Sequence, residues 1–153
     1  MGKQLCRLAV MVALSALAFI RPAAADDAFP MLVYEPYDIV PQSELISLGD
    51  PEDNGGTVLR GDITLKGRFD FLGDGMAAGI FQATTRRGVK VRVVMPFSEH
   101  ATVIIGRVTL TDEFGNRHTY NPGDSYFIKQ GSVILWEQTA PLLQKSFFNY
   151  TLP

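Results

Sequence analysis

The chain has 153 residues, of which 20% are charged, and its formal net charge is −2 at pH 7. A chain of this length is expected to build one domain around one hydrophobic core. It is weakly acidic and has no basic cluster, so nucleic acids and anionic membrane surfaces are not expected as partners.

The N-terminus has the pattern of a cleavable signal peptide over residues 1–25. Lys3 and Arg7 form a basic start, an apolar run follows from 8 to 20, and a stretch of small residues ends at Ala25. This order is typical of secretory signals, and the apolar run is too short to cross a bilayer comfortably as a helix. We therefore expect cleavage after Ala25, no membrane attachment of the mature chain, and a periplasmic or secreted location. A membrane anchor that stays attached is the alternative.

Cleavage would leave 128 of the 153 residues and no cysteine, because Cys6 is the only one. The mature chain would then have no disulfide, no thiol nucleophile and no cysteine-bound metal. Loss of Lys3, Arg7 and Arg21 would take its formal charge from −2 to −5. In an oxidising compartment its stability must then come from core packing.

Residues 26–56 are expected to form an irregular N-terminal arm, because Pro30, Pro36 and Pro41 interrupt any long element. One short strand is predicted in this arm, at Met31–Tyr34. The polar sequence PEDNGG, which ends the arm, predicts a loop. Exchange of the arm between two subunits could support a homodimer.

From residue 57 to the C-terminus, the pattern predicts short strands separated by turns. In the clearest strand, 89–95, valine alternates with Lys90 and Arg92, which is the period of a half-buried strand. The sequence DEFGN at 112–116 predicts a hairpin loop. Eight or nine strands at this spacing indicate an all-β sandwich or closed barrel, because closure removes exposed strand edges. The other strand candidates lie within 57–71, 77–85, 101–110, 117–120, 125–129, 132–137 and 144–152.

Two spacings in this region resemble the sequence motifs of the cupin superfamily. Glu99 is followed by six residues and Gly106, and Gly123 is followed by five residues and then Lys129-Gln130-Gly131. The stretch TLTDEFG and the pair Trp136-Glu137 most resemble the cupin subgroup related to ureidoglycine aminohydrolase. The resemblance implies a single cupin double-stranded β-helix, or jelly-roll barrel, over 57–153, with any ligand pocket inside the barrel.

The histidines that bind metal in most cupins are missing from the corresponding positions. Those positions hold Val93 and Met95 (or Arg92 and Val94 in the other register) and Ile134, while Lys129 and Gln138 replace the motif proline and asparagine. Only Glu99 remains of the usual set. One carboxylate cannot hold a transition metal tightly, because such sites need three or four converging donors. We therefore expect no metal and no other cofactor.

Glu99 is the candidate catalytic residue. As the motif glutamate it would point into the barrel, where apolar surroundings raise the pKa of a carboxyl group and make it a possible general base. The alternative is a structural ion pair with Arg92 or Arg107. His100 follows Glu99 directly, and neighbouring residues on a strand point to opposite faces, so a regular strand would keep it out of the site. His118 is expected in solvent.

The candidate ligand-binding residues are two cations and three apolar residues. The cations would bind an acidic ligand if they faced inward, and the apolar side chains would line the barrel. They are Arg92, Lys129, Met95, Ile134 and Trp136.

The expected function is that of an exported, metal-independent cupin that binds a small ligand or a partner without catalysis. Two alternatives are a metal-independent isomerase or lyase with Glu99 as base, and a metalloenzyme with an atypical site. The three differ in what should lie beside Glu99. A binding module predicts an aromatic interior without a titratable cluster, the metal-independent enzyme predicts a second polar group, and the metalloenzyme predicts His100 or His118.

Overall fold

The computed structural model describes residues 32–151, and the predicted signal peptide and its cleavage site lie outside them. Tyr34–Pro153 forms one compact unit. Its described part consists of strands and short 3₁₀ helices, without an α-helix. Within residues 32–151, no helix is both long enough and apolar enough to cross a membrane.

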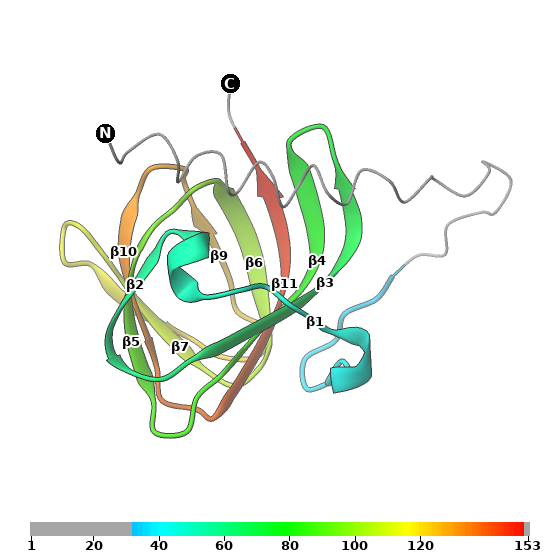
Figure 1. The fold of residues 1–153 in the computed structure, drawn as a ribbon, viewed down its shortest axis with the longest axis horizontal. Helices are drawn as coiled ribbons and strands as arrows, with labels where there is room; N and C mark the ends of the chain where they lie inside the picture. Colours follow the sequence, from blue (N-terminus) through cyan, green and yellow to red (C-terminus); the bar gives the residue numbers. More distant parts are fainter. Residues whose placement is uncertain (1–31, 152–153) are drawn as a thin grey trace, which may run out of the picture. The chain divides into compact units, whose positions relative to one another are not determined.

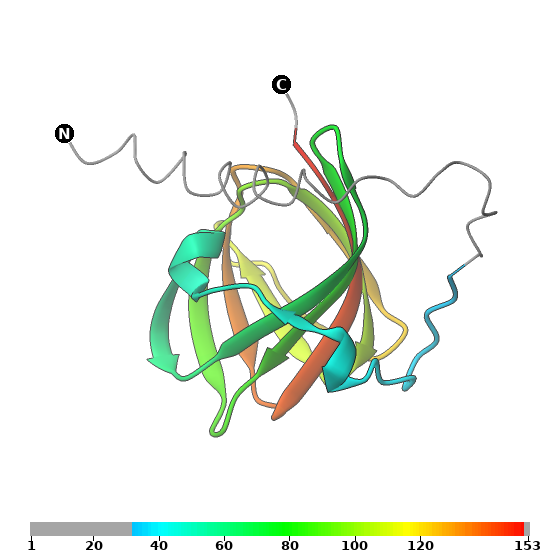
Figure 2. The ribbon, with the colours of Figure 1, turned by 45° about the vertical axis from the view of Figure 1, so that its right-hand side comes forward.

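The strands form two antiparallel sheets that curve around a common interior (Figures 1 and 2). The six-stranded sheet has the order β1 (Ile46–Ser47), β3 (Thr64–Gly73), β4 (Met76–Thr84), β11 (Leu142–Tyr150), β6 (Ser98–Ile105) and β9 (Ser125–Ile128). The five-stranded sheet has the order β2 (Gly56–Gly61), β5 (Val89–Val94), β10 (Val133–Gln138), β7 (Val108–Asp112) and β8 (Arg117–Tyr120). Two 3₁₀ helices, η2 (Gln42–Glu44) and η3 (Pro51–Asn54), precede β1 and β2.

The core lies between the two sheets, as the alternating pattern of the strands requires. On β5, Val89 and Val91 are buried and Val93 packs against the core, whereas Arg92 is exposed. The all-β prediction, the inward face of this strand and the hairpin loop between β7 and β8 are therefore confirmed.

Two local predictions were wrong. The part of the expected strand Met31–Tyr34 that the structure describes, residues 32–34, forms no strand. The long β-branched run at 101–110 is not one strand but the end of β6 and the start of β7. The chain turns between them at Gly106, whose φ is 83°.

Gly106, the motif glycine, sits against the backbone of β11. A Cβ atom at this position would lie 2.1 Å from the carbonyl oxygen of Leu142. We expect Gly106→Ala to lower the free energy of unfolding by about 1–3 kcal/mol or more. The positive φ is strained for alanine, and the added Cβ would meet a backbone carbonyl that cannot easily move. Urea unfolding would measure the effect. Gly115→Ala is the control, since its φ is 86° but nothing lies within 4 Å of its Cβ position. An equal loss in the two variants would contradict the role given to Leu142.

The N-terminal arm packs across the outer face of the six-stranded sheet (Figure 2). Leu45 forms a small buried cluster with Ile80 and Ile104, which are 0% and 2% exposed, and Tyr34 and Val40 cover it. The arm thus seals a second apolar layer outside the barrel.

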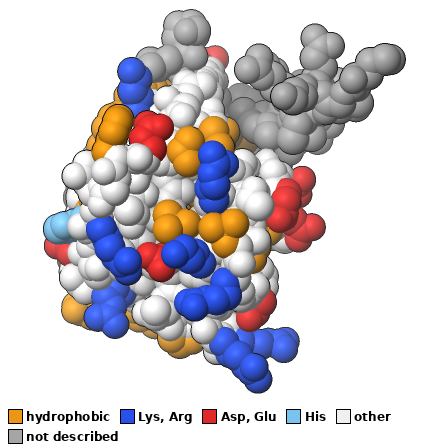
Figure 3. All heavy atoms as spheres, turned by 90° about the vertical axis from the view of Figure 1, so that its left-hand side faces the viewer, with side chains coloured by type: hydrophobic (Ala, Val, Ile, Leu, Met, Phe, Trp, Pro, Cys, Tyr) orange, Lys and Arg blue, Asp and Glu red, His pale blue; other side chains and the backbone are white. Residues whose placement is uncertain are grey.

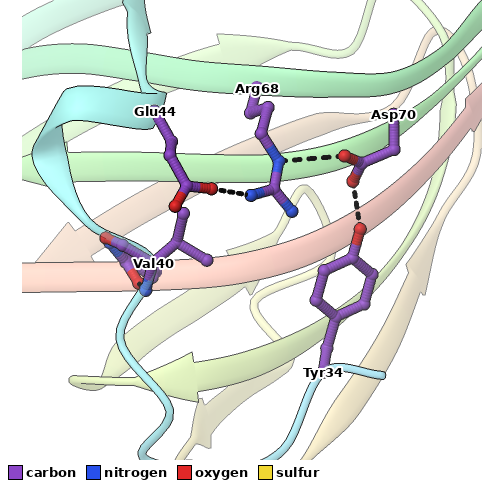
Figure 4. Close-up of polar contacts among 6 residues, drawn as sticks. Tyr34, Val40, Glu44, Arg68 and Asp70 are labelled. Atoms are coloured by element: carbon purple, nitrogen blue, oxygen red, sulfur yellow. Dashed lines mark hydrogen bonds and ion pairs between the residues drawn. The ribbon is translucent and has the colours of Figure 1, made fainter. Parts of the chain in front are cut away.

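Besides hydrogen bonds from Gln42 to Gln82 and from the backbone of Tyr37 to that of Ile104, two groups of polar contacts fix the arm. In the first, Arg68 on β3 binds both Glu44 and Asp70, and the hydroxyl of Tyr34 donates to Asp70 (Figure 4). In the second, the buried side chain of Gln144 on β11 exchanges two hydrogen bonds of 2.9 Å with the backbone of Val40. These contacts tie the arm to strands from both ends of the sequence.

Candidate functional site

Three polar side chains from three strands of the six-stranded sheet meet inside the barrel. Glu99 on β6, Tyr126 on β9 and Lys145 on β11 are 5%, 6% and 3% exposed. Lys145 lies between Leu143 and Phe147 on the inward face of its strand, and both of these residues belong to the core. The alternation of β11 therefore carries a lysine into the barrel interior.

The three groups bind one another directly. The ammonium group of Lys145 lies 2.5 Å from Oε1 of Glu99 and donates to the hydroxyl of Tyr126 at 2.9 Å. The Tyr126 hydroxyl donates to the same Glu99 oxygen at 3.2 Å. We refer to these three residues as the Lys145 cluster.

Aromatic rings surround the lysine. Its Nζ lies 4.8 Å from the ring centroid of Phe81, 5.1 Å from that of Trp136 and 5.4 Å from that of Tyr126. Cation–π attraction at these distances favours the charged form, but the rings also exclude water. Burial lowers the pKa of Lys145 below its ordinary value of 10.5, and the nearby Glu99 carboxylate offsets only part of this effect.

Trp136 on β10 brings an unused donor to this cluster. Its side chain is 7% exposed, and its indole Nε1 is buried without a hydrogen-bond partner among the described residues. Buried donors are nearly always paired, and an unpaired one costs about 1–3 kcal/mol. Such a donor beside a buried cation has the chemistry of a site that accepts a ligand oxygen.

The structure brings some of the predicted site residues to this interior and leaves others outside. Met95, Ile134 and Trp136 are buried in the core together with Glu99. Arg92 and Lys129 are exposed, and they do not reach the cluster. Lys and Arg side chains gather on the face shown in Figure 3, which is the side where Figure 1 labels β2, β5 and β10. The ion-pair partner of Glu99 is Lys145, not Arg92 or Arg107 as the structural alternative had it.

Neither histidine is among the described contacts of Glu99. His100 is exposed on the opposite face of β6, as predicted, between Phe127 of β9 and Phe148 of β11. His118 is exposed on β8 and makes an edge contact with Tyr120, with the ring centroids 4.6 Å apart. The donors at Glu99 are thus an ammonium group and a phenol, a set that does not fit the metal of metal-binding cupins, because the ammonium would repel a second cation. Within residues 32–151, no three His, Cys, Asp or Glu side chains are grouped closely enough to hold a metal ion.

Lys145 is the functional candidate that the sequence analysis missed. The segment QKSFFNYTL was predicted to be a strand, but its inward face was not assigned. Leu143 and Phe147 flank Lys145 at spacings of two residues, so the period-two rule places all three on one face. A lysine between two large apolar residues in a predicted strand was the available signal.

Burial raises the pKa of Tyr126 well above its ordinary value of 10.0, and the charge of Glu99 adds to this effect. A raised folded-state pKa gives stability that is present below pH 10 and is lost as pH rises through the folded pKa. We therefore expect the stability difference between wild type and Tyr126→Phe to fall above pH 10, by up to about 1.4 kcal/mol per pH unit. Urea unfolding from pH 8 to pH 11 would measure it. A difference that does not change with pH would contradict the raised pKa.

Comparisons with known proteins agree with this architecture. Residues 73–147 match the family of EutQ-like cupin domains. The EutQ protein of Clostridium difficile is similar over 74% of this chain and 80% of its own, with 16% identity and a TM-score of 0.52. A protein of unknown function of the DUF861 family from Pseudomonas syringae is similar over 61% of this chain and 43% of its own, with 21% identity and a TM-score of 0.50. No curated protein matches. At these identities the solved structures show the fold alone, and the predicted cupin fold is confirmed.

Proposed function

We propose that this chain, which carries a cupin domain of the EutQ-like type, binds a small organic molecule inside its barrel, through an acceptor oxygen placed at the Lys145 cluster. The observation that carries this proposal is the indole N–H of Trp136, which is buried without a partner among the described residues beside a buried ammonium group. The ring of Phe81 would pack against the apolar part of the ligand.

The residues at this site favour a ligand with hydrogen-bond acceptors. Lys145, Tyr126 and Trp136 all carry donors, and the Glu99 carboxylate already balances the charge of Lys145. Stability alone does not explain why Lys145 and Glu99 form an ion pair in the core, since well-packed apolar side chains in their place would often stabilise the core as well or better. A role in ligand binding gives the pair a reason to be in the core. This role requires no metal, and metal-independence is part of the proposal.

Trp136 is the only tryptophan in the chain, so it reports on this site alone. We expect propionamide or propanal to shift the indole N–H resonance of Trp136 and its fluorescence, and propionate to do so less, because Glu99 already balances the charge of Lys145. Lys145→Met should weaken this response, whereas Lys129→Met, which removes an exposed lysine, should leave it unchanged. If none of the three probes moved the indole resonance at millimolar concentration, the proposal would fail.

A second candidate is the metal-independent isomerase or lyase with Glu99 as base. The observation in its favour is that Glu99 is buried beside two further titratable groups, Lys145 and Tyr126, which is the arrangement expected of that enzyme. This cluster differs from the interior without titratable groups that was expected of a binding module. Wild-type protein would then exchange the α-protons of a bound carbonyl compound with D₂O, and Glu99→Gln would not. The closer kinship to the ureidoglycine-aminohydrolase subgroup stays a prediction, which the stretch TLTDEFG and the Trp136-Glu137 pair support.

We also propose that the domain acts after export, in the periplasm or outside the cell. The support is the basic start, apolar run and alanine triplet of residues 1–25. N-terminal sequencing of the protein from a periplasmic extract or culture medium should begin at Asp26. An intact Met1 on protein found only in the cytoplasm would refute export.

A further inference from the structure

The Lys145 amine has the surroundings of a reactive lysine. Desolvated lysines in apolar sites act as nucleophiles towards carbonyl compounds. Burial lowers the pKa of the ammonium group, so the neutral amine, which is the nucleophile, forms more readily. Lys145 is 3% exposed, within three aromatic rings, and the same burial lowers its pKa. The other described lysines, Lys66, Lys90 and Lys129, are half-buried or exposed at the surface.

The net charge of the Lys145 cluster favours uncharged carbonyl ligands over carboxylate ligands. Lys145 and Glu99 together carry no net charge, so a second carboxylate brought into this interior would be an uncompensated anion. An uncharged carbonyl oxygen avoids that cost and can still accept from Tyr126 or Trp136. The site therefore favours an aldehyde or ketone over a carboxylic acid anion.

We infer that Lys145 binds a small aldehyde or ketone covalently, as an imine. This inference rests on the proposed function, because the ligand must first occupy the same interior.

The neighbours of Lys145 can handle every proton in this step. Glu99, at 2.5 Å, takes one proton from the ammonium, and the amine lone pair then forms a C–N bond to the carbonyl carbon. The carbonyl electron pair moves to oxygen, which takes up the proton held by Glu99 and a second proton that nitrogen releases by way of Tyr126. The nitrogen electron pair then forms the C=N bond as the C–O bond breaks and water leaves. One ammonium and one carbonyl give one iminium and one water, without oxidation or reduction. The product keeps its positive charge beside Glu99, so the ion pair survives the reaction.

Reductive trapping on the intact protein tests the inference. Wild-type protein would be incubated at neutral pH with propanal, and separately with butanone, reduced with sodium borohydride, and mapped by peptide mass spectrometry. We expect alkylation of Lys145 in preference to Lys66, Lys90 and Lys129, by about tenfold for each unit by which its pKa is lowered. Labelling confined to the three surface lysines would overturn the inference. Because the test uses wild-type protein, its outcome does not depend on the folding of a variant.

Two further measurements separate this inference from the proposed function. If the Trp136 resonance responds to propionamide and propanal but Lys145 is not trapped, binding stands and the imine is wrong. If neither occurs, both fail. Glu99→Gln and Tyr126→Phe should slow trapping at Lys145 while leaving trapping at Lys90 unchanged, because only Lys145 depends on them for proton transfer. Equal trapping rates at Lys145 in wild type and both variants would overturn the proton-transfer roles.

Discussion

Replacing Lys145 by methionine is expected to lower the free energy of unfolding by about 3–5 kcal/mol, because the substitution leaves the Glu99 carboxylate buried without its partner. Glu99→Gln should cost a similar amount, since it leaves the ammonium group uncompensated. Both side chains are nearly inaccessible, at 3% and 5% exposed, so water cannot replace the missing charge. Urea unfolding at neutral pH would measure both effects.

The double variant distinguishes a charge effect from a packing effect. With both charges removed, Glu99→Gln/Lys145→Met should be more stable than either single variant, because an uncharged pair carries no desolvation cost. Glu137→Gln is the matched control, since Glu137 pairs with Lys90 and Arg117 on the outer face, where its partners are 35% and 61% exposed and the pair is expected to contribute only about 0–1 kcal/mol. Strictly additive single-variant losses would show that the two residues are not coupled.

The stability difference between wild type and Lys145→Met is expected to increase with pH. The folded-state pKa of Lys145 is lowered from 10.5, so its contribution to stability is fully present above pH 10.5 and is lost as pH falls through the lowered pKa. Wild type should therefore gain stability relative to Lys145→Met as pH rises towards 10.5. A relative loss over this window would mean that Glu99 outweighs burial and raises the pKa of Lys145.

Removing the part of the arm that precedes β1 is the other change expected to have a large effect. A chain that begins at Ile46 keeps β1 but exposes the outer side of Ile80 and Ile104, which are 0% and 2% exposed in the intact unit. Fully exposing side chains of this size costs about 1.5–3 kcal/mol each, a large part of the stability of about 5–15 kcal/mol typical of a domain. We expect the melting temperature to fall by at least about 10 °C.

A chain that begins at Leu32 is the control for this truncation, because it retains every described arm contact. Gln144→Leu in the control chain would show how much the two hydrogen bonds to Val40 contribute. Equal melting temperatures for the chains starting at Leu32 and Ile46 would mean that the arm is not part of the stable unit.

The fold was predictable because its signals are local. Alternation on β5, the hairpin sequence at 112–116 and the spacing from Glu99 to Gly106 each report on a few neighbouring residues. The break at Gly106 was not resolved by the strand prediction, because β-branched residues on both sides conceal a turn made by one positive φ. The role of the arm was not predictable either, since its partners lie up to 104 residues away along the chain.

The site was only half predictable, for a related reason. The motif identified Glu99, and burial follows for Met95, Ile134 and Trp136 from their place in the barrel. Arg92 and Lys129 were chosen as inward cations without evidence for their face, and both are exposed. The cation that binds Glu99 comes from β11, which pairs with β6 only in the folded sheet, so no spacing in the sequence joins Glu99 to Lys145.

The position of β11 also has a consequence for the order in which the domain can assemble during synthesis. This strand, the last one among the described residues, lies in the middle of its sheet, between β4 and β6, and carries both Lys145 and Gln144. Until the ribosome has released it, β4 and β6 each have an open edge, Glu99 has no counter-ion and the arm has no anchor on Gln144. The nascent chain thus passes through a stage with unpaired strand edges, where association with other chains competes with folding. Once β11 has emerged, it can complete the sheet, the contact of the arm with Gln144 and the Lys145 cluster.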